Sequence, residues 1–180
     1  AKGFAAGYAP LGAMAARRDI VDAVMASGGF AHGYTYAGNP LACSAGVAVL
    51  EVLQRGNLVD RARVMGDKLK SELKDLMSHY EIIGDVRGKG LLLAFELVSD
   101  RKTMAPLPPQ LNAHVELVEE AYKRGLIIYS RRTRGGTTGD HFMVCPPLII
   151  DEDQIAEIIG LLAESLDAMI AKLNLPPRSG

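Results

Sequence analysis

Lys2 is the residue of this sequence best suited to covalent chemistry. It is the only charged residue among the first fourteen, and Gly3, Gly7, Gly12 and Pro10 predict a backbone that turns tightly around something it must approach closely. A lysine held among small residues loses solvation, which lowers its pKa and frees the amine to attack a carbonyl group. The spacing alone also fits a solvated surface lysine, which is the commoner case.

A second segment, residues 32–43, has the composition of an anion-binding loop. It reads His-Gly-Tyr-Thr-Tyr-Ala-Gly-Asn-Pro-Leu-Ala-Cys, and its glycines let main-chain N–H groups approach an anion while Thr35 adds a hydroxyl donor. The alternative is a helix-capping loop with Thr35 exposed. The other residues of interest are His32, more simply a solvated loop residue; Tyr8 and Tyr34, candidates to line a pocket; and Tyr36 and Cys43, expected to pack.

Together the two segments resemble the class III pyridoxal-phosphate aminotransferases, the omega-transaminase group. The matching residues are Ala-Lys-Gly followed by Gly-Tyr-x-Pro-Leu-Gly-Ala at the start of the chain, and the run over 32–43. The resemblance implies pyridoxal 5'-phosphate as cofactor, Lys2 as its Schiff-base lysine, and Tyr34 and Thr35 as cofactor-binding residues. In that family the matching threonine binds the phosphate held by the neighbouring subunit, so a homodimer or higher homo-oligomer is expected.

Two further segments recur in the small domain of the same family, residues 85–91 and 145–150. Arg87 and Lys89 in the first could form an anion site, but a charged turn between strands is the better interpretation. The double proline Pro146-Pro147 in the second is interpreted as architecture that aims the last helix.

The loop over residues 130–140 departs from the family pattern. Many family members end the preceding strand with an arginine that binds the substrate carboxylate through two hydrogen bonds, whereas here that position is Tyr129. Arg131, Arg132 and Arg134 follow in a longer glycine-rich loop, and a plain surface loop remains an alternative. Arg132 is selected as the substrate-binding residue, with small-molecule amines and keto acids as the expected substrates.

Composition excludes several classes of partner. The 180 residues carry a net charge of −1, which gives no electrostatic reason to expect nucleic acid or an anionic membrane as partner. No apolar run approaches the roughly 18 residues that a membrane-spanning helix needs, so a cytoplasmic protein is expected. Cys43 and Cys145 belong to no metal-ligand pattern and are expected to be reduced, packed thiols.

Hydrophobic periodicity predicts the secondary structure. The expected helices are a short one around 20–25, an enclosed one over 40–53 that is apolar on all sides, amphipathic ones over 57–80 and 111–122, and a last one capped by Asp151 and Gln154. The expected strands are a buried one over 11–16, a pair over 81–86 and 91–98 around a turn at 88–90, and a pair over 126–129 and 142–145. Residues 99–109 and 130–140 are expected to be loops.

This order of elements predicts an α/β arrangement joined to an α+β one. We expect residues 1–57 to be the end of the large cofactor domain of a type I pyridoxal-phosphate transferase fold, 58–175 to be the small C-terminal α+β domain, and 176–180 to be a disordered tail. The glycine-rich phosphate turn, stacking aromatic and pyridine-binding aspartate that family members carry before the lysine are not found here, so we expect a C-terminal portion of a larger enzyme.

Three functions remain open at this point. The first is an aminotransferase that passes an amino group from an amine or omega-amino acid to a keto acid such as pyruvate. The second is another reaction of the same family, by an aminomutase, decarboxylase or phospho-lyase, because the matching segments bind cofactor and do not choose substrate. The third is an inactive binding domain, although such a domain would expose the apolar helix over 40–53.

Overall fold

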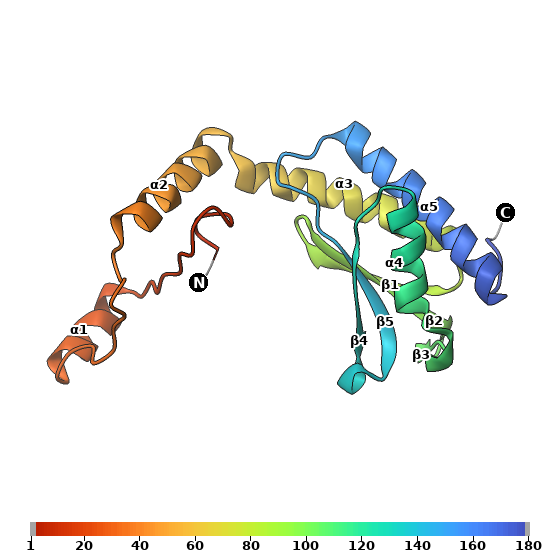
Figure 1. Cartoon of the computed structure of the whole chain (residues 1–180), viewed down its shortest axis with the longest axis horizontal. Coiled ribbons are helices and arrows are strands. Elements are labelled where there is room, and N and C mark those ends of the chain that lie inside the picture. The colour runs from red at the N-terminus through yellow and green to blue at the C-terminus, as the bar shows by residue number, and fades with distance from the viewer. Residues whose placement is uncertain (1–2, 179–180) are drawn as a thin grey trace. The chain divides into compact units, whose positions relative to one another are not determined.

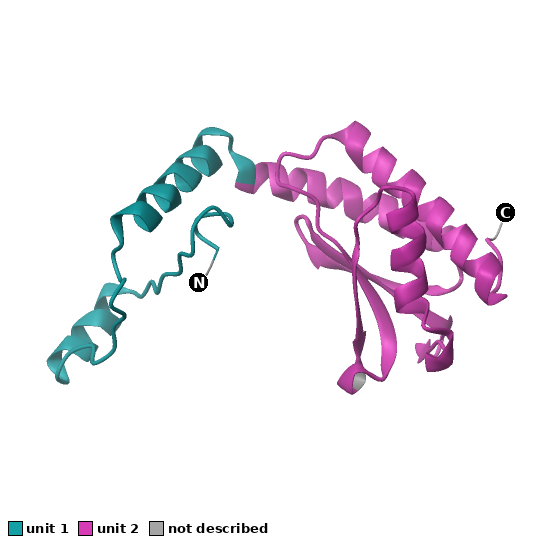
Figure 2. Cartoon of the chain, viewed as in Figure 1, with its two compact units in different colours: residues 1–58 teal, residues 59–180 magenta. Residues whose placement is uncertain are grey.

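The chain is divided into two compact units, residues 1–58 and 59–180 (Figures 1 and 2). The computed structural model describes residues 3–178, without the side chain of Arg134. The division falls one residue from the predicted boundary after residue 57. Whether it is also a domain boundary of a longer protein stays a prediction.

The first unit consists of two helices joined by irregular segments. These are α1 (Arg18–Ala26) and α2 (Pro40–Arg55). Asn39 caps α2 because its side-chain oxygen accepts a hydrogen bond from the Ala42 amide at 3.1 Å, and Pro40 occupies a first-turn position where no amide donor is needed. Both predicted helices and the Asn39 cap are confirmed.

The predicted strand over residues 11–16 is wrong. Apart from an isolated bridge at Gly12, these residues are irregular, and all but the half-buried Leu11 are exposed. Glycine and alanine, which make up most of the run, are poor strand formers, so its apolar composition alone does not produce a strand. The predicted enclosure of α2 is also missing among the described residues, since the Leu41 side chain is 78 % exposed.

The second unit packs three helices against an antiparallel sheet. Its elements in chain order are α3 (Leu58–His79), β1 (Ile83–Lys89), β2 (Leu92–Asp100), β3 (Ala105–Pro106), η1 (Pro109–Leu111), α4 (Ala113–Lys123), β4 (Tyr129–Thr133), η2 (Arg134–Gly136), β5 (Thr138–Val144) and α5 (Glu152–Leu173). The strand order is β1-β2-β5-β4, and β3 pairs with β2. This element order confirms the predicted α+β arrangement.

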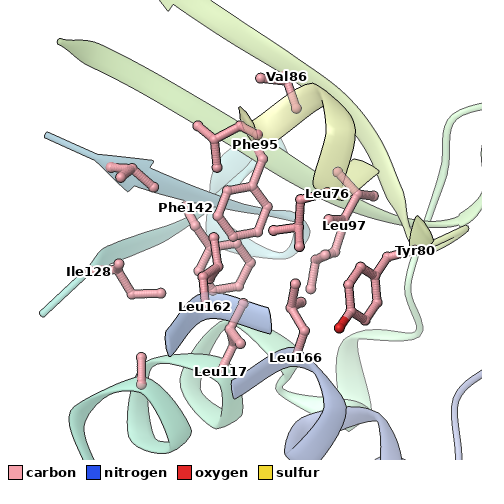
Figure 3. Packing of buried hydrophobic residues seen from close by; sticks show 14 of the residues in the cluster. Leu76, Tyr80, Val86, Phe95, Leu97, Leu117, Ile128, Phe142, Leu162 and Leu166 are labelled. Carbon is pink, nitrogen blue, oxygen red and sulfur yellow. The ribbon is translucent and has the colours of Figure 1, made fainter. Parts of the chain in front are cut away.

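One hydrophobic core holds the second unit together (Figure 3). Phe95 from β2 and Phe142 from β5 stack with their ring centroids 5.0 Å apart. Leu76 of α3, Leu117 of α4 and Leu166 of α5 belong to the same buried cluster. The core therefore joins all three helices to one face of the sheet.

Helix α4 buries a different face from the one predicted. The sequence favoured Leu111, Val115, Val118 and Tyr122, yet the Tyr122 side chain is 71 % exposed and Val115 is also exposed. The buried residues are Ala113, Leu117, Glu120 and Ala121. Ala113, Leu117 and Ala121 follow one another at i, i+4 spacing on one face, and the two small alanines let that face pack closely.

Strand boundaries also differ from the prediction. Strand β1 runs through Arg87 to Lys89, and β4 and β5 extend into the segment predicted as a loop over 130–140. Burial in β2 alternates, with Leu93 buried and Leu92 exposed, so the predicted cover on both faces is wrong. The apolar run over 91–98 places Leu92 on the exposed face as well, and a single exposed leucine does not require cover.

The start of α5 is as predicted. The Asp151 side chain accepts from the Gln154 amide at 2.8 Å, while the Gln154 side chain accepts from the Asp151 amide at 3.1 Å. In the tail predicted to be disordered from 176, the guanidinium carbon of Arg178 lies 5.6 Å from the centroid of the Tyr80 ring, and the disorder stays a prediction. Asn57, predicted to cap α3, has a left-handed backbone, φ 46°, rather than the extended one of an ordinary cap.

Candidate functional site

The backbone that follows Lys2 makes two successive tight turns. Lys2 itself lies outside the described residues, so its role stays a prediction. The Ala6 amide donates to the Gly3 carbonyl at 3.0 Å, and the Tyr8 amide donates to the Ala5 carbonyl at 2.8 Å. Gly3 and Gly7 have φ of 80° and 86°, a region that favours glycine, which explains the glycines around the lysine.

A pocket with a volume of ≈ 530 Å³ lies between the two segments selected from the sequence. Residues 9–12 of the opening loop form one wall, and Tyr34, Tyr36 and Leu41 contribute to the other. Tyr34 thus lines the pocket as predicted, whereas Tyr8 is not among the lining residues. The fold therefore brings together two segments that are about 25 residues apart in the chain.

Thr35 lies in an exposed turn at the rim of this pocket, between the lining residues Tyr34 and Tyr36. The Ala37 amide closes the turn by donating to the Tyr34 carbonyl at 2.9 Å. No hydrogen bond to another described residue occupies the Thr35 hydroxyl, and the space around Gly33 is open. An exposed Thr35 ahead of the Asn39 cap is equally what the alternative of a helix-capping loop expects, so phosphate binding by Thr35 stays a prediction.

Of the aromatic residues of the same loop, Tyr36 differs from its expectation and His32 agrees with it. The Tyr36 side chain, predicted to pack, is 81 % exposed and lines the pocket. His32, interpreted as a solvated residue, is exposed but places its ring edge-on to Tyr34, with centroids 4.8 Å apart. Of the two free cysteines, Cys43 is half-buried and Cys145 is exposed rather than packed.

Arg87 is engaged in ion pairs on the sheet. Its Nη1 lies 2.8 Å from Asp85 Oδ2 and 2.9 Å from Glu96 Oε2. The hydrogen bond to Asp85 is the main cause of the raised pKa of Arg87, and Glu96 adds to it. Strand β1 continues to Lys89, so both basic residues lie on a strand and not in the predicted turn.

Arg132 makes several contacts within the second unit. Its Nε donates to Asp140 Oδ1 at 3.0 Å, and its Nη2 donates to the Pro109 carbonyl at 2.6 Å and to Asn112 Oδ1 at 3.2 Å. The side chains of Arg132 and Asp140 are only 14 % and 3 % exposed. The geometry therefore shows Arg132 linking β4, β5 and the segment before α4.

Arg131, the preceding residue, is exposed. Its Nε donates to the Tyr129 hydroxyl, and its guanidinium lies over the Tyr129 ring at 5.1 Å from the centroid. In the strand pairing Arg131 is opposite His141, whose Nδ1 is buried and has no hydrogen-bond partner among the described residues.

Sequence reasoning missed His114 and Asp140. His114 Nδ1 lies 3.4 Å from Asp140 Oδ1, and burial is the main reason that the pKa of His114 is lowered, with the charge of Arg132 adding to the effect. Asp140 raises that pKa less strongly, so neutral His114 is favoured. The only signal in the sequence was Asp140 in a segment interpreted as a loop, which could not place it opposite Arg132.

Two other kinds of site are not seen in the described part of the chain. No group of three or more His, Cys, Asp or Glu residues between 3 and 178 could hold a metal ion. Over the same residues, no helix combines the length and apolarity needed to cross a membrane.

Comparison with known proteins gives consistent matches over nearly the whole chain. The family described as "Aminotransferase class-III" matches residues 1–166. The "Uncharacterized aminotransferase YodT" of Bacillus subtilis is 36% identical over 175 residues, which is 96% of this chain and 39% of that protein. A "Probable gamma-aminobutyrate transaminase 3, mitochondrial" of Oryza sativa subsp. indica is 30% identical, over 93% of this chain and 32% of that protein.

A solved structure matches the fold. The amine transaminase from an uncultivated Pseudomonas species, in its PLP-bound form, has a TM-score of 0.78 and 35% identity, covering 94% of this chain and 37% of that one. This match confirms the predicted fold class. The chain spans less than two fifths of the length of each of these three proteins.

Proposed function

Because the chain belongs to the class III aminotransferase family, we propose that the full-length protein is an aminotransferase that uses pyridoxal phosphate. The observation that carries the proposal is the pocket between residues 9–12 and the segment that includes Tyr34 and Leu41. Both walls come from the two segments that resemble the cofactor-binding parts of this family. The solved relative whose title describes a PLP-bound form supports the choice of cofactor.

Each proposed cofactor residue has a separate task. Pyridoxal phosphate supplies an aldehyde that takes the amino group and a ring that withdraws electrons from the substrate. Lys2 would hold the cofactor through its amine and would move a proton at the reacting carbon. Thr35 donates a hydrogen bond to the phosphate, and Tyr34 forms part of the pocket wall.

The proposed substrates are an amine or omega-amino acid donor and a keto acid such as pyruvate. The rice relative named as a probable gamma-aminobutyrate transaminase supports an omega-amino acid as donor. A keto acid carries a carboxylate, and an arginine of β4 is proposed to bind it, with Arg132 as the residue selected from the sequence. A cytoplasmic homodimer, in which one subunit's Thr35 binds the phosphate held by the other, completes the proposal.

Borohydride reduction of the full-length protein loaded with pyridoxal phosphate tests the role of Lys2. Reduction should fix the pyridoxyl group covalently on one lysine and remove the absorbance of the bound cofactor, and peptide mapping should find the label on Lys2. Lys89 serves as the control because it lies on β1, in the other unit. Label on any lysine other than Lys2 would refute the assignment.

A second measurement tests the reaction itself. The loaded full-length protein is incubated with pyruvate and either 4-aminobutyrate or a simple primary amine, and alanine is measured. Formation of alanine is the expected result. Loss of carbon dioxide or phosphate from the donor, with no alanine from any amine, would favour another reaction of the family instead.

A further inference from the structure

The buried carboxylate of Asp140 has two basic neighbours. Asp140 on β5 lies opposite Arg132 on β4, and its side chain is only 3 % exposed. Arg132 Nε donates a hydrogen bond to Asp140 Oδ1 at 3.0 Å. His114, in the first turn of α4, places its Nδ1 atom 3.4 Å from the same oxygen. One carboxylate oxygen therefore faces both a guanidinium that is always charged and an imidazole that gains its charge only in acid.

The ion pair of Arg132 with Asp140 supports the attachment of the β4–β5 hairpin. Arg132 Nη2 donates to the Pro109 carbonyl at 2.6 Å and to Asn112 Oδ1 at 3.2 Å, and both acceptors belong to the segment just before α4. Because Asp140 is the ion-pair partner of this guanidinium, a weaker pair would loosen Arg132 from all three acceptors. A second positive charge at Asp140 is a change that would weaken the pair.

His114 is placed to supply that second charge. Its side chain is 22 % exposed, so protons can reach the ring, while Nδ1 is buried. Nδ1 makes no hydrogen bond to any described residue, although Asp140 Oδ1 lies 3.4 Å away. Neutral imidazole can keep its one proton on Nε2, whereas the charged ring carries a proton on both nitrogens, and Nδ1 then needs an acceptor. The acceptor within reach is the oxygen that Arg132 already uses.

Other charged groups near the start of α4 have partners of their own or lie in solvent. The ion pairs are Glu116 with Lys172 of α5, and Glu120 with Lys123 and Arg124, while Glu119 is exposed. His141 follows Asp140 on β5, so its side chain points to the opposite face of the sheet. Among the described residues, Arg132 and Asp140 are therefore the charges that His114 faces.

We propose that His114, Asp140 and Arg132 form an acid-sensitive link that holds the β4–β5 hairpin to the segment before α4. While His114 is neutral, Asp140 Oδ1 serves Arg132 alone. In acid, the protonated ring competes with Arg132 for this oxygen, and the hairpin opens more often. The link lies wholly in the second unit and does not depend on the proposed function.

The direction of the pH dependence follows from the pKa of His114. Burial lowers this pKa from the ordinary value of 6.5, the charge of Arg132 lowers it further, and Asp140 raises it less strongly. When the hairpin opens, His114 returns to water and its pKa returns toward the ordinary value, so the open state takes up a proton first. The closed hairpin therefore has its full stability above pH 6.5 and loses stability as the pH falls toward the lower pKa of the closed state.

Hydrogen exchange of the full-length protein, followed by mass spectrometry of peptides from residues 129–144, measures opening of the hairpin. After correction for the chemical exchange rate at each pH, protection of these amides should fall about threefold or more between about pH 7 and about pH 5. His114→Gln, whose side chain takes up no proton, should remove most of this fall. His79→Gln, in the last turn of α3, is the control and should keep it. An equal fall in His114→Gln and the wild type would overturn the proposal.

Titration of isotope-labelled histidine by NMR tests the competition itself in the full-length protein. The signal that disappears in His114→Gln should titrate below pH 6.5 in the wild type. Arg132→Gln should raise the pKa of His114, because a nearby positive charge is lost, and Asp140→Asn should lower it further. Arg132→Lys keeps the charge and should keep the low pKa, which provides a comparison if Arg132→Gln does not fold. A His114 signal that titrates at or above pH 6.5 in the wild type would refute the link.

Discussion

The two units of this chain differ in where their apolar residues lie. In the second unit, Phe95, Phe142 and residues of all three helices are buried in one core. In the first unit α2 has a single buried residue, Gly46, and apolar side chains such as Leu41 and Val47 are exposed. The segments that resemble the cofactor site are in the unit that lacks a core. Among the described residues, the hydrophobic core therefore lies in the second unit, whereas the proposed cofactor residues belong to the first.

Producing the two units as separate polypeptides is the most direct test of this difference. A polypeptide of residues 57–180 should unfold cooperatively, because its core is complete, and a polypeptide of residues 1–58 should show no cooperative transition. Circular dichroism during thermal unfolding measures both. A cooperative transition of the 1–58 peptide alone would show that the first unit needs no further partner.

Truncation of a stacked ring tests the core of the second unit. Phe142→Ala removes a fully buried side chain that stacks on Phe95, and it should lower the free energy of unfolding by about 3–5 kcal/mol. Tyr122→Ala, on the exposed side of α4, should change it by about 0.5 kcal/mol or less. Similar losses in urea denaturation of the two variants would contradict the observed orientation of α4.

Two helical glycines in the second unit give a matched pair. A Cβ on Gly66 of α3 would lie 2.2 Å from the carbonyl carbon of Gly90, so Gly66→Ala should cost about 1–3 kcal/mol of unfolding free energy. A Cβ on Gly160 of α5 would meet nothing within 4 Å, so Gly160→Ala should stabilise the protein by up to about 1 kcal/mol. Urea denaturation should show opposite signs, and equal signs would exclude a close contact at Gly66.

Substitutions at Thr35 test the proposed role of the first unit in cofactor binding. In the full-length protein, Thr35→Ala should weaken retention of pyridoxal phosphate about tenfold, because one hydrogen bond to an anion is lost, and Thr35→Ser should retain most of the binding. Equilibrium dialysis measures the retention. The cofactor-free Thr35→Ala protein should unfold at the wild-type urea concentration, since Thr35 makes no contact with the core. Unchanged retention would remove Thr35 from the site.

The smallest effect expected is a dependence of stability on alkaline pH. Burial, together with the hydrogen bond from the Tyr80 hydroxyl to Asp167, raises the pKa of Tyr80 to about 12. The unfolded chain loses this proton near pH 10, so stability from Tyr80 is complete below about pH 10 and declines as the pH rises toward 12. The decline should be steeper in wild type than in Tyr80→Phe, and parallel curves from urea denaturation would contradict the raised pKa.

Local features were predictable from the sequence, and features that depend on distant contacts were not. The caps at Asn39 and Asp151 involve residues within three positions, so the sequence contains all the partners. The buried face of α4 depends on the sheet beneath it, and its alanines could not be ranked above Tyr122 by periodicity alone. The polar residues of β4 and β5 resemble a loop until the pairing of Arg132 with Asp140 is known.

In the candidate site, too, local features could be predicted and features that depend on distant contacts could not. Tyr34 could be selected because family resemblance identifies short segments, and it lines the pocket. The faces of the sheet on which Arg131 and Arg132 lie were not predicted, because residue type does not show to which face of a strand a side chain points. His114 was missed for a related reason, since its contact with Asp140 joins a helix to a strand more than 20 residues away.

The bulge that follows Arg132 has a consequence for how this hairpin can change during evolution. Pairing shifts between Arg132 and Thr133, so alternation is interrupted just after the buried arginine. An insertion on the far side of the bulge, among residues 134–137, would lengthen the hairpin tip without exchanging inner and outer positions. A one-residue deletion at Ser130 would make Tyr129 and Arg131 consecutive, so their side chains would no longer share one face of the sheet. Descendants of this sequence should therefore vary in length at the tip and keep a constant length between Tyr129 and Arg132.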